Sequence, residues 1–580
     1  MKGAAAGSLA LAALAGGIPG LTRADAAPAA RRVAVLGGGV AGLTAAHELA
    51  ERGFEVTVYD RKGWGGKARS MDTPFLGVDG RAPLPGEHGY RFFPGFFAAL
   101  PDTMRRIPYP GNAKGTFDNL VPALALTGAL NAPDITLPFA LDFDAIGLAL
   151  EPRKAVKTLL AGLTWLPRLP LADLTVLVRR LLVFLTSCDE RRYGQWEHQS
   201  FKDFVKMDGT DPNYQLLIST FTRTLVAAKE DIAGARSICG LAESFLLNII
   251  NRGNDNRFPD SVLDGPSNEV WIDPWIACLR GLGVRFELGT EVRSLSVAGG
   301  VIDGATVEFA GGGTRAVAAD WYVLAVPPER AAGLLGPDIL ELAPELAGIA
   351  DIDLDWMNGV QFFLGRERPI GQGHIGFIET PWRLSGIHQN QFWKREIADG
   401  YGDGKVADIL SVCVADWDAP GLRNTKRARD CRPEEVAAEV WHQIMLSQQG
   451  EPLTDRLGDQ DVLGWFLDPA IRWDGAVNGN DHPLTINSAG SWDLRPGAAT
   501  AIPNLFLAGD YTRNNIDLAC MEGANEGGRT ARNALLTAAG SDAGPARLWP
   551  KLTLREFDGA RAMDLARWRA GQPNLLDLPG

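Results

Sequence analysis

Residues 31–70, RRVAVLGGGVAGLTAAHELAERGFEVTVYDRKGWGGKARS, decide the fold. Residues 33–36 are apolar and partly β-branched, which predicts a buried strand. Glycines follow at once, and apolar residues then recur at helical spacing as far as Ala50. A second strand is expected over residues 55–59. The stretch therefore predicts a strand, a glycine turn, a helix and a second strand.

The glycine turn, residues 37–42, carries the spacing of a dinucleotide-binding fingerprint. Gly37 allows the tight turn, Gly39 lets the backbone approach a pyrophosphate, and Gly42 lets helix and strand pack closely. Val40 and Ala41 lie at the helix N-terminus, where free N–H groups and the positive end of the helix dipole face the phosphates. These five residues are predicted to bind a dinucleotide.

An acidic residue and a second glycine pair follow the second strand. Asp60 lies 18 residues after Gly42, near the usual place of the residue that accepts a hydrogen bond from a ribose hydroxyl. Gly65, Gly66 and Lys67 come next. This segment resembles flavoproteins of the amine oxidase and carotenoid desaturase superfamily. The resemblance implies FAD as cofactor, held in part by Asp60, Arg61, Gly65, Gly66 and Lys67.

A second signature lies more than 400 residues further on. Residues 504–511 read as a buried strand that ends in Gly509-Asp510, and a helix is expected to begin at Met521. In the same superfamily a Gly-Asp pair contacts the diphosphate and ribityl chain. The resemblance implies that the helix start, Met521 to Ala524, points at the flavin pyrimidine, where a helix N-terminus would stabilise the charge of reduced flavin. The resemblance also implies that Val292 meets the adenine through its backbone.

The expected fold class is α/β, a two-domain FAD-binding Rossmann-like fold of the amine oxidase (GR2) type. It has a mixed-sheet substrate domain and a helical cap. A hairpin is expected over 301–313, and substrate-domain strands over 361–364, 375–378 and 408–414. The expected segments are 31–105, 262–330 and 480–545 for the FAD-binding domain, 106–261 and 331–479 for the substrate domain with its cap, and 546–580 for a C-terminal helical tail.

Residues 86–97, GEHGYRFFPGFF, place five aromatic side chains beside three ionisable ones. They resemble a His- and Phe-rich segment of plant-type phytoene and zeta-carotene desaturases. We expect His88, Tyr90, Arg91 and Phe92 to line the flavin and substrate cavity, with a core strand as the alternative. The sequence identifies no catalytic residue.

Two segments are open to a membrane-related interpretation. Residues 154–166 and 173–186 read as apolar helices with interspersed bases, which suits either a peripheral membrane contact or a buried cap. Residues 1–30 have the layout of a signal peptide, resembling a truncated twin-arginine signal, or form a disordered tail. The protein is therefore expected to be exported, or membrane-associated in the cytoplasm.

Composition narrows the function further. The net charge of −13 argues against nucleic-acid binding, and the six cysteines and seven histidines show no metal-binding spacing. No covalent flavin-cysteine motif is evident, so FAD is expected to be noncovalent. The favoured function is oxidation or reduction of an apolar isoprenoid, carotenoid- or squalene-type, by hydride transfer at flavin N5, with quinone or oxygen as electron acceptor. The alternatives are a flavin amine or amino-acid oxidase that uses oxygen, and a flavin-binding protein without turnover.

Overall fold

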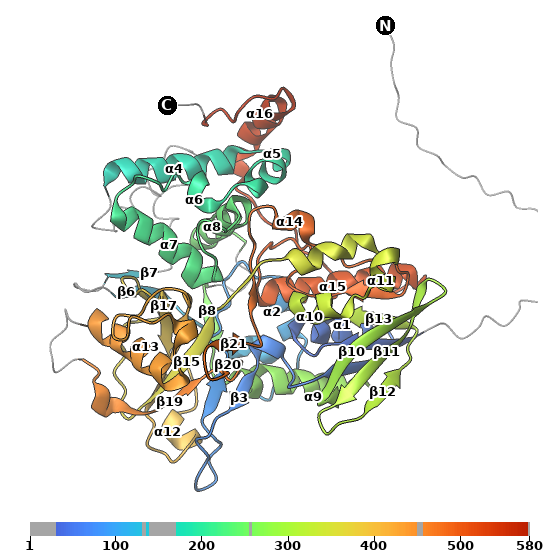
Figure 1. Cartoon of the computed structure of the whole chain (residues 1–580), viewed down its shortest axis with the longest axis horizontal. Helices are drawn as coiled ribbons and strands as arrows, with labels where there is room; N and C mark the ends of the chain where they lie inside the picture. The colour runs from blue at the N-terminus through green and yellow to red at the C-terminus, as the bar shows by residue number, and fades with distance from the viewer. Residues whose placement is uncertain (1–30, 130–134, 139–169, 254–257, 449–455, 578–580) are drawn as a thin grey trace, which may run out of the picture.

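A computed structural model describes residues 31–129, 135–138, 170–253, 258–448 and 456–577. Figure 1 shows two sheet-containing regions side by side, one around β13 (Trp321–Leu324) and α1 (Val40–Ala50) and one around β15 (Asn358–Leu364) and α13 (Pro433–Ser447). A group of helices, α4 to α8, lies over them. The cavity described below is lined by residues from all three regions.

The first region is built on a five-stranded parallel sheet of order β23-β13-β1-β2-β9. Its strands are β1 (Arg32–Leu36), β2 (Glu55–Asp60), β9 (Arg285–Leu288), β13 (Trp321–Leu324) and β23 (Leu505–Leu507). Both faces of β1 are buried, since Val33 and Val35 enter one hydrophobic cluster and Ala34 and Leu36 another. Continuous apolar runs suit such a doubly covered sheet. The strands predicted from both signatures are confirmed.

Helices α1 (Val40–Ala50) and α15 (Met521–Ala538) pack together on one face of this sheet. A Cβ on Gly528 would lie 2.4 Å from the carbonyl oxygen of Ala41, so only glycine allows this approach. Asn525 of α15 donates a hydrogen bond to Thr44 of α1 at 2.8 Å. Helices α2 (Ala99–Arg105) and α9 (Asp273–Gly281) complete this layer.

The opposite face is covered by an antiparallel sheet and by short helices. The sheet contains β10 (Thr290–Ala298), β11 (Val301–Phe309) and β12 (Thr314–Val317), so the predicted hairpin over 301–313 is confirmed. Helices α10 (Pro328–Leu334) and α11 (Pro337–Leu342) join the same hydrophobic cluster. That cluster extends to Ile352, so residues 331–352 pack with the FAD-binding segments rather than with the second sheet.

The second region is a seven-stranded mixed sheet of order β19-β15-β18-β17-β16-β6-β7. All neighbours are antiparallel except β16 and β6, which run parallel. Helix α13 (Pro433–Ser447) packs on it, and Trp382, Trp417 and Trp441 fill the space between them. The strands are β6 (Ala125–Ala129), β7 (Ile135–Pro138), β15 (Asn358–Leu364), β16 (His374–Phe377), β17 (Leu384–His388), β18 (Asp408–Val414) and β19 (Val462–Leu467).

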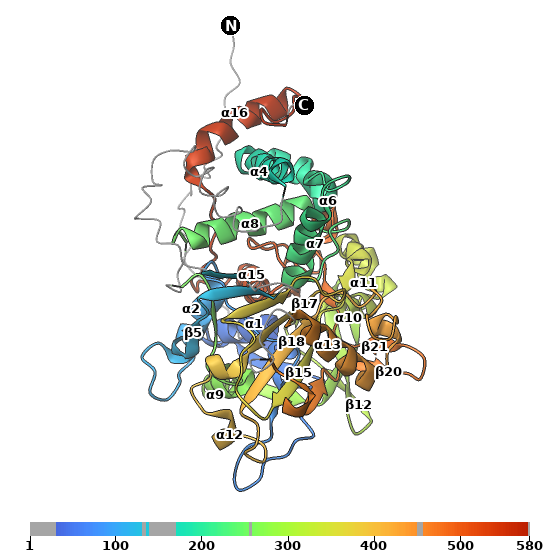
Figure 2. The same ribbon diagram turned by 90° about the vertical axis from the view of Figure 1, so that its left-hand side faces the viewer.

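The helices of the cap stand above both sheets, and Figure 2 shows α4 and α8 stacked over α15 with α16 outermost. The C-terminal segment fastens this layer, because Arg191 and Asp564 form a buried ion pair at 2.9 Å. The helices are α4 (Leu171–Thr186), α5 (Asp189–Gly194), α6 (Phe201–Phe204), α7 (Pro212–Val226), α8 (Ala235–Ile249) and α16 (Asp558–Arg569). The helix expected over 154–166 lies outside the described residues. None of the helices in the described ranges is long and apolar enough to span a membrane.

Short elements connect these layers. They are β3 (Ser70–Asp72), β4 (Pro85–Glu87), β5 (Leu120–Pro122), β8 (Ser261–Leu263), β14 (Leu354–Asp355), α12 (Ile397–Gly400), β20 (Ile471–Trp473), β21 (Asn478–Asn480), β22 (Leu484–Thr485) and α14 (Ser491–Leu494).

Candidate active site

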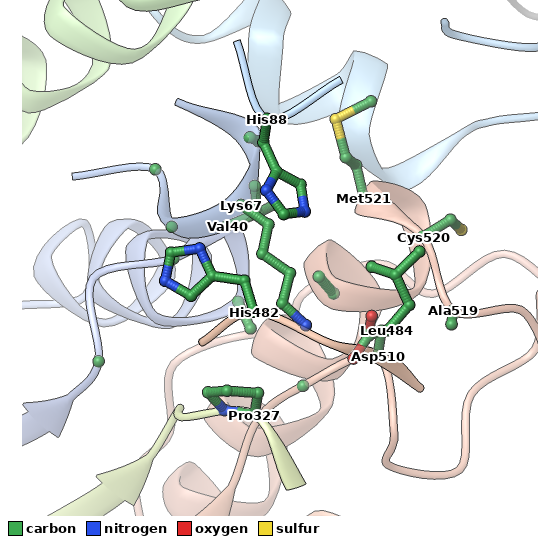
Figure 3. Close-up of a pocket in the computed structure, with 18 of the residues that line it drawn as sticks. Val40, Lys67, His88, Pro327, His482, Leu484, Asp510, Ala519, Cys520 and Met521 are labelled. Carbon is green, nitrogen blue, oxygen red and sulfur yellow. The ribbon is translucent and has the colours of Figure 1, made fainter. Parts of the chain in front are cut away.

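A cavity of about 520 Å³ lies where the three regions meet. Its walls come from the glycine turn after β1, the N-terminal turn of α15, the segment after β4 and helices α7 and α8. In Figure 3 the side chains of His88, Lys67, His482 and Leu484 enter it from different parts of the chain. The cavity therefore joins the predicted cofactor signatures to the expected substrate side.

The three fingerprint glycines each meet a distinct steric demand. Gly37 has a φ of +121°, and a Cβ there would lie 2.4 Å from the carbonyl oxygen of Ala325. A Cβ on Gly42 would lie 1.9 Å from the carbonyl oxygen of Gly37, so Gly42 serves the helix–strand contact and does not line the cavity. At Gly39 the nearest atom to an added Cβ is 3.9 Å away. Gly39, with Val40 and Ala41, lines open space at the N-terminus of α1.

The second glycine pair closes the floor of the cavity. Gly65 and Gly66 both have positive φ, +93° and +59°. The N–H of Gly65 donates to the carbonyl oxygen of Gly38 at 2.8 Å, and a Cβ on Gly66 would lie 3.0 Å from Cα of Gly39. Two glycine turns thus leave a bare backbone cradle, which is what a dinucleotide phosphate group requires.

Asp60 lines the cavity but also supports the first turn. Its carboxylate accepts hydrogen bonds from the backbone N–H groups of Gly38 at 2.8 Å, Lys62 at 2.8 Å and Gly63 at 3.0 Å. The sequence indicated only a ribose contact for Asp60, which stays a prediction. The structure shows that Asp60 also holds the turn. A carboxylate can accept several hydrogen bonds, so both roles are compatible.

Charged groups gather beside the cradle. Lys67 donates a hydrogen bond to the carbonyl oxygen of Pro483. Its positive charge also acts to lower the pKa of Asp510 and of Glu329. Burial raises the pKa of Asp510, although Lys67 and Arg495 act in the opposite direction. Burial also raises the pKa of Glu329, whose two oxygens have no hydrogen-bond partner among the described residues. An unpaired carboxyl group on a cavity wall fits a ligand that brings hydroxyl groups, as the ribose and ribityl parts of FAD do.

The second signature supplies the opposite wall. Gly509, Asp510, Met521 and Ala524 all line the cavity, and Val292 lines it from β10. The N-terminus of α15 is capped by Sγ of Cys520, which accepts from the N–H of Gly523 at 3.4 Å. Burial raises the pKa of this thiol, which keeps it protonated and unreactive.

The aromatic segment after β4 also lines the cavity, as expected for His88, Tyr90, Arg91 and Phe92. The hydroxyl of Tyr90 donates to Oγ of Ser385 at 3.0 Å. The guanidinium of Arg91 donates to the carbonyl oxygens of Gly89 and Lys67, so it ties this segment to the second glycine turn. The alternative of a core strand is wrong at these four positions, because β4 ends at Glu87.

Part of the cavity wall is apolar, and sequence reasoning did not identify it. Helices α7 and α8 contribute Leu225, Leu241 and Phe245 to it. Helical periodicity in the sequence predicts that such residues are buried, but it does not predict that they line a cavity. The apolar residues of the wall are Phe96, Phe97, Leu225, Leu241, Phe245, Met357, Leu484 and Leu518. The sequence also missed His482, Cys413 and Arg69, which line other parts of the wall and carry no local motif.

Comparison with known families explains this arrangement. A profile of the family described as flavin containing amine oxidoreductase matches residues 235–536. The chain belongs to this family. A second profile, described as FAD dependent oxidoreductase, matches residues 32–73, which contain the first glycine turn. The protein is therefore an FAD-dependent oxidoreductase of the amine oxidase superfamily, and the backbone cradle and the unpaired Glu329 fit that cofactor.

Solved structures share the fold. Cyclohexylamine oxidase from Brevibacterium oxydans IH-35A aligns with a TM-score of 0.54 at 15% identity, covering 88% of this chain and 99% of its own. Putrescine oxidase bound to putrescine aligns with a TM-score of 0.53 at 14% identity, covering 88% and 98%. An oxidoreductase from Methanosarcina mazei gives 0.52 at 15%, covering 86% and 98%. These identities establish likeness of fold alone. No curated protein sequence matches the chain.

Proposed function

We propose that this FAD-dependent oxidoreductase oxidises an apolar isoprenoid of the carotenoid or squalene type. The single observation that carries the proposal is the apolar part of the cavity wall, where Leu225, Leu241 and Phe245 line the same space as the cofactor cradle. Burial of a hydrocarbon chain against such a lining stabilises the complex by about 25 cal/mol of free energy for each Å² of apolar surface removed from water. When bound, FAD supplies the two-electron acceptor that takes up a hydride from the substrate.

The chain's own residues orient and enclose the reactants. The glycine turns at Gly39 and Gly66 leave room for the diphosphate, and the N-terminus of α15 presents a positive dipole end to the same cavity. This dipole end favours negative charge on the reduced cofactor. Helices α7 and α8 contribute Leu225, Leu241 and Phe245 to the apolar part of the wall, where the substrate would lie.

Amine oxidation is the second candidate, and the aromatic wall is what favours it. Tyr90 and Phe92 both line the cavity, with ring centroids 6.5 Å apart. Aromatic faces bind ammonium groups through cation–π attraction. The two rings are tilted by 44° and do not form a parallel pair. Arg91 is not free to bind a substrate carboxylate, because it pairs with Glu87 and donates to two carbonyl oxygens.

Anaerobic mixing separates the candidates. FAD-loaded protein is mixed with squalene, a partly saturated C40 carotene, cyclohexylamine or putrescine, and flavin absorbance is followed. Bleaching by a hydrocarbon and not by an amine supports the isoprenoid proposal, and the reverse pattern contradicts it. Bleaching by none of the four would indicate a flavin-binding protein without turnover. Adding oxygen or a quinone to bleached enzyme then identifies the electron acceptor.

We further propose that the cap takes its substrate from a lipid surface. Leu171, at the start of α4, is 70% exposed. Leu182 on the same helix packs instead against the cluster that contains Leu185 and Phe557, so the buried-cap interpretation holds for that side chain. Co-sedimentation with neutral liposomes tests the proposal, with Leu171→Glu as the variant that should lose binding while keeping its FAD. Failure of the wild-type protein to bind would contradict it.

A further inference from the structure

Among the described residues, three buried histidines pair with aspartates: His88 with Asp468, His374 with Asp260, and His388 with Asp408. The pairs differ in their surroundings. His388 has its second ring nitrogen, Nε2, occupied by the N–H of Ile370 at 3.1 Å, so both nitrogens serve the fold. Of the three histidines, only His88 lines the cavity.

The two ring nitrogens of His88 have different surroundings: Nδ1 contacts a buried aspartate, whereas the residue itself lines the cavity. The residue is 7% exposed, and Nδ1 forms an ion pair with Oδ2 of Asp468. Nε2 has no hydrogen-bond partner among the described residues, and Nδ1 has only this close charged contact, without a well-directed hydrogen bond. A buried nitrogen without a partner is costly, so its place on the wall of a ligand cavity indicates that a ligand meets it. In Figure 3 the ring extends from its backbone into the space that it shares with Lys67 and Leu484.

Asp468 is held in a fixed orientation. Its carboxylate accepts from Nδ2 of Asn358 at 2.6 Å and from the N–H of Ala470 at 2.9 Å. Asn358 is oriented in turn by Asn480, whose Nδ2 donates to its Oδ1 at 2.8 Å. Burial disfavours the charged carboxylate, but His88 and these donors outweigh burial and hold the pKa of Asp468 below its usual range. A carboxylate beside Nδ1 favours the neutral ring form that carries its proton on Nδ1 and its lone pair on Nε2.

A second histidine on the wall does not compete for this role. The ring of His482 lies 5.7 Å from that of His88, centroid to centroid. Burial is the largest cause that lowers the pKa of His482, and it favours the neutral form of that ring. Among the described residues it forms no ion pair with a carboxylate that could stabilise a positive ring.

We propose that His88 is the catalytic base, taking a proton from the substrate at Nε2. The proposal rests on the proposed oxidation. One C–H bond of the substrate gives its hydrogen and electron pair to FAD, and the neighbouring C–H bond gives its proton to Nε2 while its electrons form the C=C bond. Asp468 is a positioning residue that stabilises the resulting imidazolium. If the substrate is an amine, the proton comes from the nitrogen and a C=N bond forms.

Substitution of the base tests this step. His88→Gln should lower the rate of flavin reduction at saturating substrate by about 10²- to 10⁴-fold, the usual contribution of a general base. FAD content and melting temperature should stay those of the wild type. His88→Ala should recover part of the rate with added imidazole. His388→Gln removes a matched His–Asp pair outside the cavity, so it should leave the rate within about threefold of the wild type. A rate in His88→Gln equal to that in His388→Gln would overturn the proposal.

The ring state of His88 gives a second readout that needs no turnover. In FAD-loaded protein with ¹⁵N-labelled histidine, the signals of the neutral His88 ring should show a proton on Nδ1 and none on Nε2. Asp468→Asn should change this pattern and slow flavin reduction, and Asp468→Glu should restore both in part. A neutral ring protonated at Nε2 would overturn the assignment even if every variant unfolds.

The mixing experiment with the four compounds distinguishes failure of the isoprenoid proposal from failure of the His88 proposal. If cyclohexylamine bleaches the flavin and the hydrocarbons do not, the isoprenoid proposal fails and the His88 variants are measured with the amine. If no compound bleaches it, the oxidation proposal fails, and the measured ring state still supports or overturns the role given to His88.

Discussion

Gly39 is the residue at which a side chain would interfere with the cofactor and with little else. Its backbone is extended, with φ −75° and ψ −178°, and an added Cβ meets nothing closer than 3.9 Å. Gly39→Val should therefore fold normally and contain no FAD, because the side chain would fill the cradle. Flavin absorbance and a melting curve of the apoprotein check both parts.

Gly42→Val provides the contrast. There a Cβ would lie 1.9 Å from the carbonyl oxygen of Gly37, so this variant should lose stability as well as cofactor. Full flavin occupancy in Gly39→Val would show that the cradle is not the diphosphate site.

Glu87 should make stability depend on pH. Burial raises its pKa to about 7, against a usual value of 4.5, although Arg91 and Ser267 favour the charged form. The unfolded chain therefore loses the proton first as pH rises. The contribution of Glu87 to the free energy of unfolding is complete below pH 4.5 and is lost towards pH 7, by at most about 1.4 kcal/mol per pH unit.

Glu87→Gln should remove this dependence while keeping the contact with the N–H of Ser267, 3.1 Å from Oε1. Denaturant unfolding of both proteins at pH 5, 6 and 7 gives the two slopes. Parallel slopes would show that Glu87 does not titrate in this range.

At residue scale, the sequence predicted the residues whose roles follow from a local pattern. Gly37, Gly39 and Gly42 stand where the fingerprint requires them, and the steric limits of each are those expected. The pairing of His88 with Asp468 could not be predicted, because the two are 380 residues apart and meet only through the register of β15 and β19. The same holds for Glu329, whose exposure to the cavity depends on the turn after β13.

At the scale of elements, the contact between α1 and α15 depends on a single glycine. In Gly528→Ala the added Cβ would lie 2.4 Å from the Ala41 oxygen and 2.8 Å from Cβ of Thr44. We expect a loss of about 1–3 kcal/mol in the free energy of unfolding, the usual cost of overpacking, and lower FAD occupancy in the same variant.

Gly559→Ala is the matched control, since it lies in α16 and an added Cβ there meets nothing within 4 Å. It should be neutral or slightly stabilising, because alanine favours a helix. Equal melting temperatures for the two variants would contradict the tight packing of α1 and α15.

Helix α2 shows a dependence between elements that no periodicity reveals. The carboxylate of Glu522, in the first turn of α15, accepts from the N–H groups of Ala98, Ala99 and Leu100 at the start of α2. Glu522→Ala should cost about 1–3 kcal/mol, because buried donors are left without an acceptor. Urea unfolding measures it. A cost near zero would mean that water replaces the carboxylate.

Strand and helix positions were largely predictable, since alternating or continuous apolar runs fix them locally. Strand neighbours in the second sheet were not. β6 lies parallel to β16, with Leu126 beside His374, across 248 residues of chain. A pattern of apolar residues predicts which face of a strand is buried, but it does not predict which strand pairs with it.

At the scale of the whole molecule, the described fold begins at β1, whose first residue is Arg32. Removing residues 1–30 should therefore leave FAD content and melting temperature unchanged. Flavin absorbance and calorimetry of the shortened protein check this. Loss of flavin on removal would show that the leading residues contribute to the site. Sequencing of the mature N-terminus in the native host then decides between a signal peptide, cleaved near Ala27, and a retained tail.

The central sheet places β1 beside β13 and β13 beside β23, so strands that begin at residues 32, 321 and 505 lie next to one another. During synthesis the nascent chain must carry an unfinished sheet edge until residues 505–507 have left the ribosome. Such late, distant pairing slows folding and exposes apolar surface to aggregation. We expect FAD to be captured only after residues 505–524 have been synthesised, because the second signature lines the cavity together with the first.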